Sequence, residues 1–159
     1  MKLPNDTILT WDVDALTKAM KLDTSEVDQY FKDGRRISFI IERRIAREIL
    51  GGRIADSEGA GYDLLDKDGG KWEVRSLTKG GIYFGPSVDV GGGRKFNLDN
   101  FLAKLDQIDG YLIADITKFP NVPVYAVHKE TILAWYNSGK INKEAKTSLK
   151  RAQELLVSQ

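Results

Sequence analysis

Three charged side chains stand in a short stretch whose other residues are typical of β-strands. Asp63 comes ten residues before Glu73, and Arg75 follows Glu73 by two residues. The tetrapeptide KDGG between the two acids predicts a tight turn that joins strands at about 62–65 and 72–77. Because side chains two residues apart in a strand point to the same face, Glu73 and Arg75 should lie together on one face of the sheet.

Two carboxylates and a cation at this spacing could bind a divalent metal ion and a phosphate. Hydrolysis of a phosphodiester needs a hard cation that lowers the pKa of bound water and neutralises charge on the phosphate oxygens. Asp63 and Glu73 are the candidate ligands, and Asp66 and Glu58 are candidates for outer ligands or a second site. A surface ion pair between Glu73 and Arg75 would explain these two residues without any chemistry.

The composition narrows the kinds of site that the chain can build. Its 159 residues, 42% hydrophobic and 30% charged, predict one globular domain with a sizeable core. The chain has no cysteine and one histidine, so any metal must be held mainly by oxygen, as Mg²⁺, Mn²⁺ and Ca²⁺ are. The sequence lacks a membrane-spanning run and a secretory signal, and we expect a cytoplasmic protein that does not bind membranes.

The net charge of +1 conceals an uneven distribution of charge. Seven basic side chains stand against three acidic ones between Lys32 and Arg53, and five against one between Lys140 and Arg151. Such blocks could form a surface for a polyanion, but solvated helix faces give the same pattern.

The apolar periodicity changes from helical to strand-like along the chain. This order predicts an α/β fold with a mixed central sheet flanked by helices, because a helix between strands permits a parallel crossover. We expect an N-terminal helical part (about 1–36), a core (about 37–136) and a basic C-terminal helical tail (about 137–159). The expected helices cover 13–20, 24–33, about 37–50, 97–108 and 130–139, and the expected strands cover 62–65, 72–77, 81–87, 111–117 and 122–128.

The stretch around Asp63 and Glu73 resembles the core of the PD-(D/E)xK nuclease superfamily, and type II restriction endonucleases in particular. The family pattern has an acid on the second core strand, a turn, then acid-any-Lys on the third strand, after a helix that carries a glutamate. Asp63 matches the first acid, Glu73 the second and Glu42 the helix glutamate. The resemblance implies a restriction-endonuclease-like mixed sheet flanked by helices, here with extra N-terminal helices.

The family's lysine is replaced by Arg75 in this chain. In the family the lysine contacts the scissile phosphate and helps to activate the attacking water. A guanidinium can clamp a phosphate but, with a pKa above about 12, cannot act as a base near neutral pH. Three interpretations stay open: the metal alone acidifies water while Arg75 positions the phosphate, Lys79 supplies the ammonium, or the chain binds DNA without cutting it well.

Two glutamates compete for the helix position of the family pattern. Glu42 lies at the edge of the isoleucine stripe of the helix expected over 37–50, and Glu48 lies inside it. We assign Glu42 to the site and interpret Glu48 as a buried ion-pair partner.

Candidate DNA contacts lie in the glycine-rich segment after the third expected strand and in the basic tail. Arg94 is the first candidate for a base contact, because arginine is the commonest reader of guanine in the major groove. The other candidates are Ser87 and Lys95 in the glycine-rich segment and Lys140, Lys143, Lys146, Lys150 and Arg151 in the tail, where they would contact phosphates. We interpret His128, Trp72, Trp135 and Tyr136 as packing residues.

The resemblance implies a Mg²⁺-dependent endonuclease, with Mn²⁺ as a substitute, that cuts double-stranded DNA at a specific sequence, as restriction–modification systems do. Cutting both strands with one site per chain suggests a homodimer, or a heterodimer with a partner subunit. The alternatives are a repair or junction-resolving nuclease of the same fold, and a non-catalytic DNA-binding protein. The helix pair 13–33 is interpreted as packing, with a helix-turn-helix motif as the alternative.

Overall fold

The computed structural model describes Leu3 and residues 7–159; residues 1–2 and 4–6 of the expected N-terminal part lie outside it. In chain order its elements are β1 (Ile8–Thr10), α1 (Val13–Met20), α2 (Thr24–Phe31), α3 (Gly34–Arg44), the π-helix η1 (Ile45–Leu50), β2 (Arg53–Ile54), β3 (Leu64–Leu65), β4 (Lys71–Leu77), β5 (Ile82–Tyr83), the 3₁₀ turn η2 (Ser87–Asp89), α4 (Leu98–Gln107), β6 (Gly110–Asp115), the 3₁₀ turn η3 (Ile116–Lys118), β7 (Asn121–His128), α5 (Lys129–Asn137), β8 (Lys146–Thr147) and α6 (Leu149–Val157).

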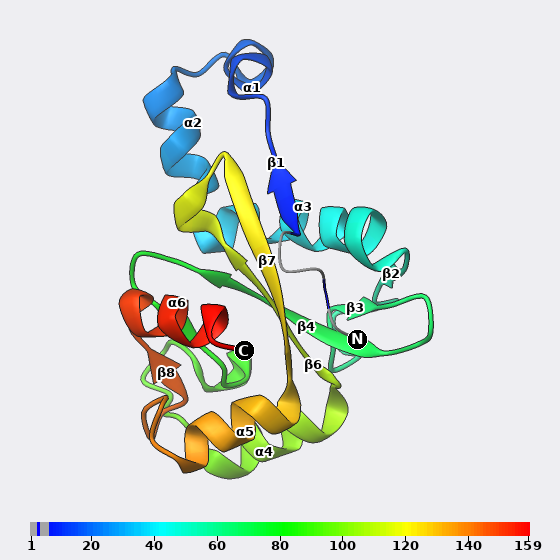
Figure 1. Ribbon diagram of the computed structural model, residues 1–159, viewed down its shortest axis with the longest axis vertical. Helices are drawn as coiled ribbons and strands as arrows, with labels where there is room; N and C mark the ends of the chain where they lie inside the picture. Colours follow the sequence, from blue (N-terminus) through cyan, green and yellow to red (C-terminus); the bar gives the residue numbers. More distant parts are fainter. Residues whose placement is uncertain (1–2, 4–6) are drawn as a thin grey trace.

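Six strands form a mixed sheet in the order β1-β7-β6-β4-β3-β2 (Figure 1). Strands β4 and β6 are parallel, because α4 crosses between them, and the other neighbours are antiparallel. Every residue of β6 is buried, as expected for a central strand with both faces covered. The predicted α/β class with a mixed sheet flanked by helices is confirmed.

The two faces of the sheet carry separate hydrophobic clusters. Along β6, Leu112 and Ala114 join the cluster formed with α2, α3 and η1, whereas Tyr111 and Ile113 join the cluster formed with α4, α5 and α6. This alternation follows from the two-residue period of a strand. Figure 1 shows α1 and α2 at one end of the molecule and α4 and α5 at the other.

The helices expected over 13–20, 24–33 and 37–50 are confirmed as α1, α2, and α3 with its continuation η1. The N-cap residue Asp33 starts α3 by accepting hydrogen bonds from the backbone N–H groups of Arg35 and Arg36. At the other end Gly51 adopts φ +57°, and a Cβ on Gly52 would lie 2.0 Å from the carbonyl oxygen of Leu65. Glycine at position 52 therefore lets the helix end contact the hairpin directly.

Two expectations about the strands and the tail are corrected. The strand expected over 81–87 is limited to Ile82 and Tyr83, and these pair with β8 in a separate two-stranded sheet rather than joining the central one. The tail over 137–159 is not one helical region, because turns and β8 precede α6. Strands β1, β2 and β8 were not predicted, since two or three residues give no alternating pattern.

The helix α2 packs into the core, as predicted for the helix pair 13–33. Phe31 of α2 stacks on Phe119 with ring centroids 4.6 Å apart, and Val27 is fully buried, so α2 contributes to the core. None of the helices in residues 7–159 combines the length and the apolar character needed to cross a membrane.

Candidate active site

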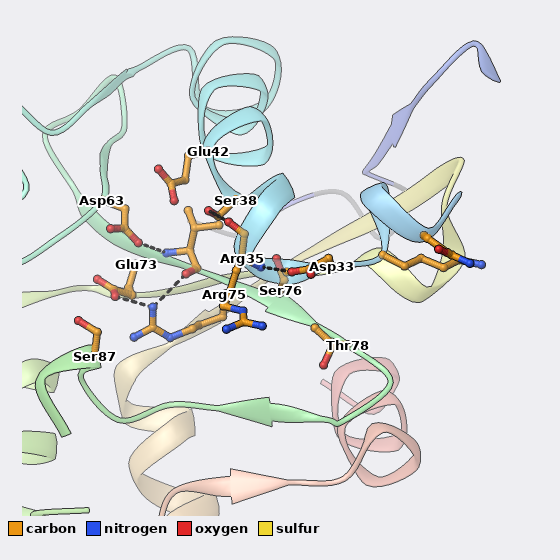
Figure 2. A pocket seen from close by; sticks show the side chains of 14 residues that line it. Asp33, Arg35, Ser38, Glu42, Asp63, Glu73, Arg75, Ser76, Thr78 and Ser87 are labelled. Carbon is orange, nitrogen blue, oxygen red and sulfur yellow. Dashed lines mark hydrogen bonds and ion pairs between the residues drawn. The ribbon is translucent and has the colours of Figure 1, made fainter. Parts of the chain in front are cut away.

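A cleft of about 860 Å³ brings together three acidic side chains from separate parts of the chain, and a fourth acid, the N-cap residue Asp33, also lines it. Glu42 comes from α3, Asp63 directly precedes β3 and Glu73 lies on β4. Figure 2 shows their carboxyl groups in succession along one side of the cleft. The cleft is lined by Gln29, Lys32, Asp33, Gly34, Arg35, Ser38, Glu42, Asp63, Glu73, Val74, Arg75, Ser76, Thr78 and Ser87.

The β3–β4 hairpin fixes Asp63 next to Glu73. Leu64 is paired with Trp72, so Asp63 and Glu73 take the next positions on the two strands and share a face. One carboxylate oxygen of Asp63, Oδ2, accepts a hydrogen bond of 2.8 Å from the backbone N–H of Val74. The carboxyl group is thereby held against β4.

Glu73 is an acid in the protein interior, with only 5% of its surface exposed. Its Oε1 lies 2.7 Å from Nη1 of Arg75, and its Oε2 forms an ion pair with Nζ of Lys104 from α4. A buried carboxylate remains charged only when cations and hydrogen bonds compensate the lost hydration. The interpretation of Glu73 and Arg75 as a surface ion pair is therefore wrong.

The guanidinium of Arg75 is directed mainly at protein acceptors. Besides Glu73, it donates hydrogen bonds to the carbonyl oxygens of Tyr83 at 3.2 Å, Gly85 at 3.1 Å and Val74 at 3.3 Å. Arg75 thus ties the β5 segment to β4 while it lines the cleft.

The lysine that contacts the carboxylate of Glu73 is Lys104, not Lys79. Lys79 is exposed in the turn after β4 and does not line the cleft. Instead, Lys104 reaches Glu73 and also donates a 3.0 Å hydrogen bond to the carbonyl oxygen of Gly61. Lys104 was missed by the sequence analysis, although it stands in the apolar stripe of its helix beside Phe101 and Leu105.

The carboxyl groups of Glu42 and Asp63 have fewer compensating contacts than that of Glu73. Burial, followed by the charge of Asp63, raises the pKa of Glu42 to about 7. Glu42 has no hydrogen-bond or ion-pair partner among the described residues. Burial and the charge of Glu73 raise the pKa of Asp63, against the lowering effect of the Val74 N–H. Burial and mutual repulsion therefore oppose the ionisation of Glu42 and Asp63, and a bound cation would favour their charged forms.

The carboxylate oxygens of the cleft are the type of ligand that a hard divalent cation prefers. Mg²⁺ is commonly held by one or two carboxylates and keeps several waters, so it does not need a complete protein cage. No group of three or more histidine, cysteine or acidic side chains in the described ranges has the spacing of such a cage. Asp63 and Glu73 would provide the ligands, with Glu42 adjacent in the same cleft.

Three further acids predicted from the sequence lie outside the cleft. Both carboxylate oxygens of Asp66 accept hydrogen bonds that close the hairpin turn, including one of 2.9 Å from Nε1 of Trp72. Glu58 is exposed in the loop before β3. Glu48 forms the expected ion pair, with Arg44, but its side chain is 49% exposed rather than buried.

Among the expected DNA contacts, only Ser87 lines the cleft. Arg94 donates hydrogen bonds to the carbonyl oxygens of Gly91 and Val88 in its own loop, and Lys95 is exposed in the same loop. The tail residues lie elsewhere: Lys140, Lys143 and Lys146 between α5 and the end of β8, and Lys150 and Arg151 in α6.

Two basic residues that do line the cleft were not singled out from the sequence. Lys32 follows α2 and Arg35 lies in the first turn of α3, and both face the same cleft as the carboxylates. The signal was present, because both belong to the basic block between Lys32 and Arg53. Charge alone did not show which members of the block would face the acids.

The aromatic residues occupy packing positions, as predicted. Trp72 and Trp135 are 1% and 6% exposed, and the hydroxyl of Tyr136 donates to the carbonyl oxygen of Lys143. The ring of His128 lies 5.4 Å from that of Trp72, at the end of β7. These residues do not line the carboxylate cleft.

Comparisons with known proteins add no family to this geometry. No family model, curated protein or solved structure matches the chain. The residues of the cleft are therefore the main indication of function.

The Glu42→Gln substitution should stabilise the metal-free protein at pH 8. The folded protein holds the Glu42 proton up to about pH 7, whereas the unfolded chain releases it near pH 4.5, so stability falls as the pH rises between these values. Partial exposure limits the gain to roughly 1 kcal/mol, or about 3 °C in Tm. Thermal unfolding followed by circular dichroism in EDTA should show this gain at pH 8 and none at pH 4. A similar gain in the surface control Glu48→Gln would contradict the assignment.

The Arg75→Lys substitution should destabilise the protein rather than restore a family lysine. An ammonium cannot span the carbonyl oxygens of Tyr83 and Gly85 together with Glu73, so the free energy of unfolding should fall by about 2 kcal/mol. Urea denaturation measures the change. Arg151→Lys, which alters one exposed ion pair, should have little effect. Unchanged stability in Arg75→Lys would show that the contacts to β5 contribute little.

Proposed function

We propose that the protein is a divalent-metal-dependent endonuclease acting on DNA, with a restriction-endonuclease-like core. The observation that carries the proposal is the convergence of Glu42, Asp63 and Glu73 on one cleft. After the helix that carries Glu42, the chain forms β2, β3 and β4 in turn. Strand β3 is therefore the second strand after this helix and β4 is the third. Asp63 directly before β3 and Glu73 on β4 support the resemblance to the PD-(D/E)xK pattern.

The residues of the cleft have distinct roles in this proposal. Asp63 and Glu73 hold the ion, and Glu42 adds a further oxygen. Bound Mg²⁺, or Mn²⁺ in its place, supplies the acidification of water and the charge neutralisation that phosphodiester hydrolysis requires. Arg75 keeps Glu73 oriented through their 2.7 Å ion pair.

The basic wall of the cleft suits a nucleic-acid backbone. Lys32 and Arg35 line the same cleft as the three acids, and the Ser87 hydroxyl adds a hydrogen-bonding group. Phosphates next to the scissile one would pair with these cations, which gives affinity without reading the sequence. Cleavage of both strands of a duplex then calls for a homodimer or for a partner subunit with a second site.

A structure-selective nuclease, for DNA repair or junction resolution, is the second candidate. Arg94, the first candidate for a base contact, is occupied by hydrogen bonds within its own loop and does not line the cleft. A site that contacts phosphates but not base edges selects by shape instead.

Cleavage should require Asp63. Wild type with Mg²⁺ is expected to cut DNA, and Asp63→Asn should lower the rate at least about 100-fold, since metal stabilisation of the charged transition state is worth several kcal/mol. The substrates are unmethylated phage DNA, four-way junctions and flapped duplexes, read on gels, with Glu58→Gln as the control at an exposed acid outside the cleft.

Each substrate separates one candidate from the others. Discrete fragments of phage DNA would support sequence-specific cleavage, and cutting restricted to junctions or flaps would support the structure-selective candidate. Intact DNA throughout, with binding retained, would replace both by a non-catalytic DNA-binding protein.

Lys32→Gln and Arg35→Gln should each weaken DNA binding and lower the slope of log K against log salt by about one. The measurement is fluorescence anisotropy with Ca²⁺ and the Asp63→Asn protein, so that DNA stays intact. Lys140→Gln and Lys143→Gln, which remove charges outside the cleft, are the matched controls. A larger loss in the controls would place the DNA on the C-terminal side of the molecule.

A further inference from the structure

Lys104 is an unusual lysine, because its side chain is only 13% exposed and its ammonium lies inside the protein. Lysine is almost never buried unless it is paired. The partners of Nζ are Oε2 of Glu73 and the carbonyl oxygen of Gly61. Lys104 belongs to α4, which packs on the face of the sheet opposite to α3.

The ammonium of Lys104 is held by a carboxylate and a carbonyl oxygen, both of which are also possible ligands of a hard metal ion. Both known partners are oxygen atoms, and the atom that it contacts on Glu73 is shielded from solvent. Asp63 is also near: its pKa is raised mainly by burial, and Lys104 is among the cations that oppose the rise. The charge of Lys104 therefore acts on both acids that the proposed function assigns to the metal.

Two cations cannot share this position without a large energetic cost. A divalent ion bound by carboxylate oxygens sits about 2.0–2.6 Å from them, depending on the metal. An ammonium in contact with the same carboxylate would then lie within a few ångströms of the ion, where like charges repel strongly in a site shielded from water. Arg75 on the other oxygen of Glu73 adds to this repulsion.

We propose that Lys104 is a built-in counter-ion that occupies the divalent cation's place at Glu73 in the metal-free protein and yields it when the ion binds. This inference rests on the proposed function, since it assumes that the ion binds at Asp63 and Glu73. It gives Lys104 a positioning role: the ammonium keeps the carboxylates together before the ion arrives and sets how tightly the ion is held.

If the ion pair between Lys104 of α4 and Glu73 of β4 were merely structural, removal of Lys104 would change the affinity for the ion in the opposite direction. If Lys104 only braced Glu73, its removal would loosen the carboxylate and weaken the binding of the ion. If Lys104 competes with the ion, its removal strengthens binding. The sign of the change in affinity separates the two roles.

The test compares wild type, Lys104→Met, Lys104→Arg and the control Lys118→Met, which removes an exposed lysine after β6. Isothermal titration with Mn²⁺ gives the affinity, and thermal unfolding with and without Mn²⁺ gives the stability. Lys104→Met should bind Mn²⁺ at least about fivefold more tightly, the lower end of the usual range of coupling between sites. It should be less stable than wild type in EDTA and gain more in Tm from Mn²⁺. Lys104→Arg, which keeps the cation, should bind as wild type does.

A second measurement uses wild type and does not depend on the folding of a variant. Lysine labelled with ¹⁵N reports the buried ammonium by NMR, and saturation with Mg²⁺ should shift the Lys104 signal. Lys118 should be unaffected.

The outcomes separate this inference from the proposed function. Equal or weaker Mn²⁺ binding in folded Lys104→Met, or an unchanged Lys104 signal when Mg²⁺ binds, overturns the counter-ion role but leaves the metal site intact. Absence of metal binding in wild type and in every variant overturns both the counter-ion role and the proposed metal site.

Discussion

The buried carboxyl group of Glu73 and its two cationic partners are the constraint around which the cleft is organised. An acid with 5% exposure needs compensating charge, and here that charge comes from two different directions. Arg75 supplies it from the same strand and at the same time binds the β5 segment, and Lys104 supplies it from α4. The positions of β4, β5 and α4 relative to one another thus depend on one buried charge.

The rest of the cleft has the opposite character. Glu42 and Asp63 have raised pKa values because burial and their neighbours' negative charge are incompletely compensated. Such sites are typical of functional rather than purely structural regions, since a fold gains no stability from uncompensated acids. The cleft therefore combines Glu73, whose charge Arg75 and Lys104 compensate, with Glu42 and Asp63, whose charges are less compensated.

How much the sequence could predict depended on the length of each pattern. The hairpin was predictable because a four-residue turn signal separates two strands, and this was enough to place Asp63 beside Glu73. Strand β2 was not, because it has two residues and is defined only by pairing with β3. Lys104 was overlooked because the helical period places it near apolar residues but does not reveal an acid on a strand that faces it. The tail residues lie outside the cleft, and charge density alone could not predict which basic residues would line it.

Because the backbone at Gly52 contacts Leu65, the position of Glu42 relative to Asp63 does not depend on the length of the loop between β2 and β3. Backbone meets backbone where η1 ends against β3, so the helix with Glu42 is anchored to the hairpin with Asp63 independently of the intervening loop. Residues 56–59 of that loop are exposed and lie outside the cleft. The fold should accordingly tolerate an insertion or a fused peptide at this point, which offers a place to attach a label or a second module.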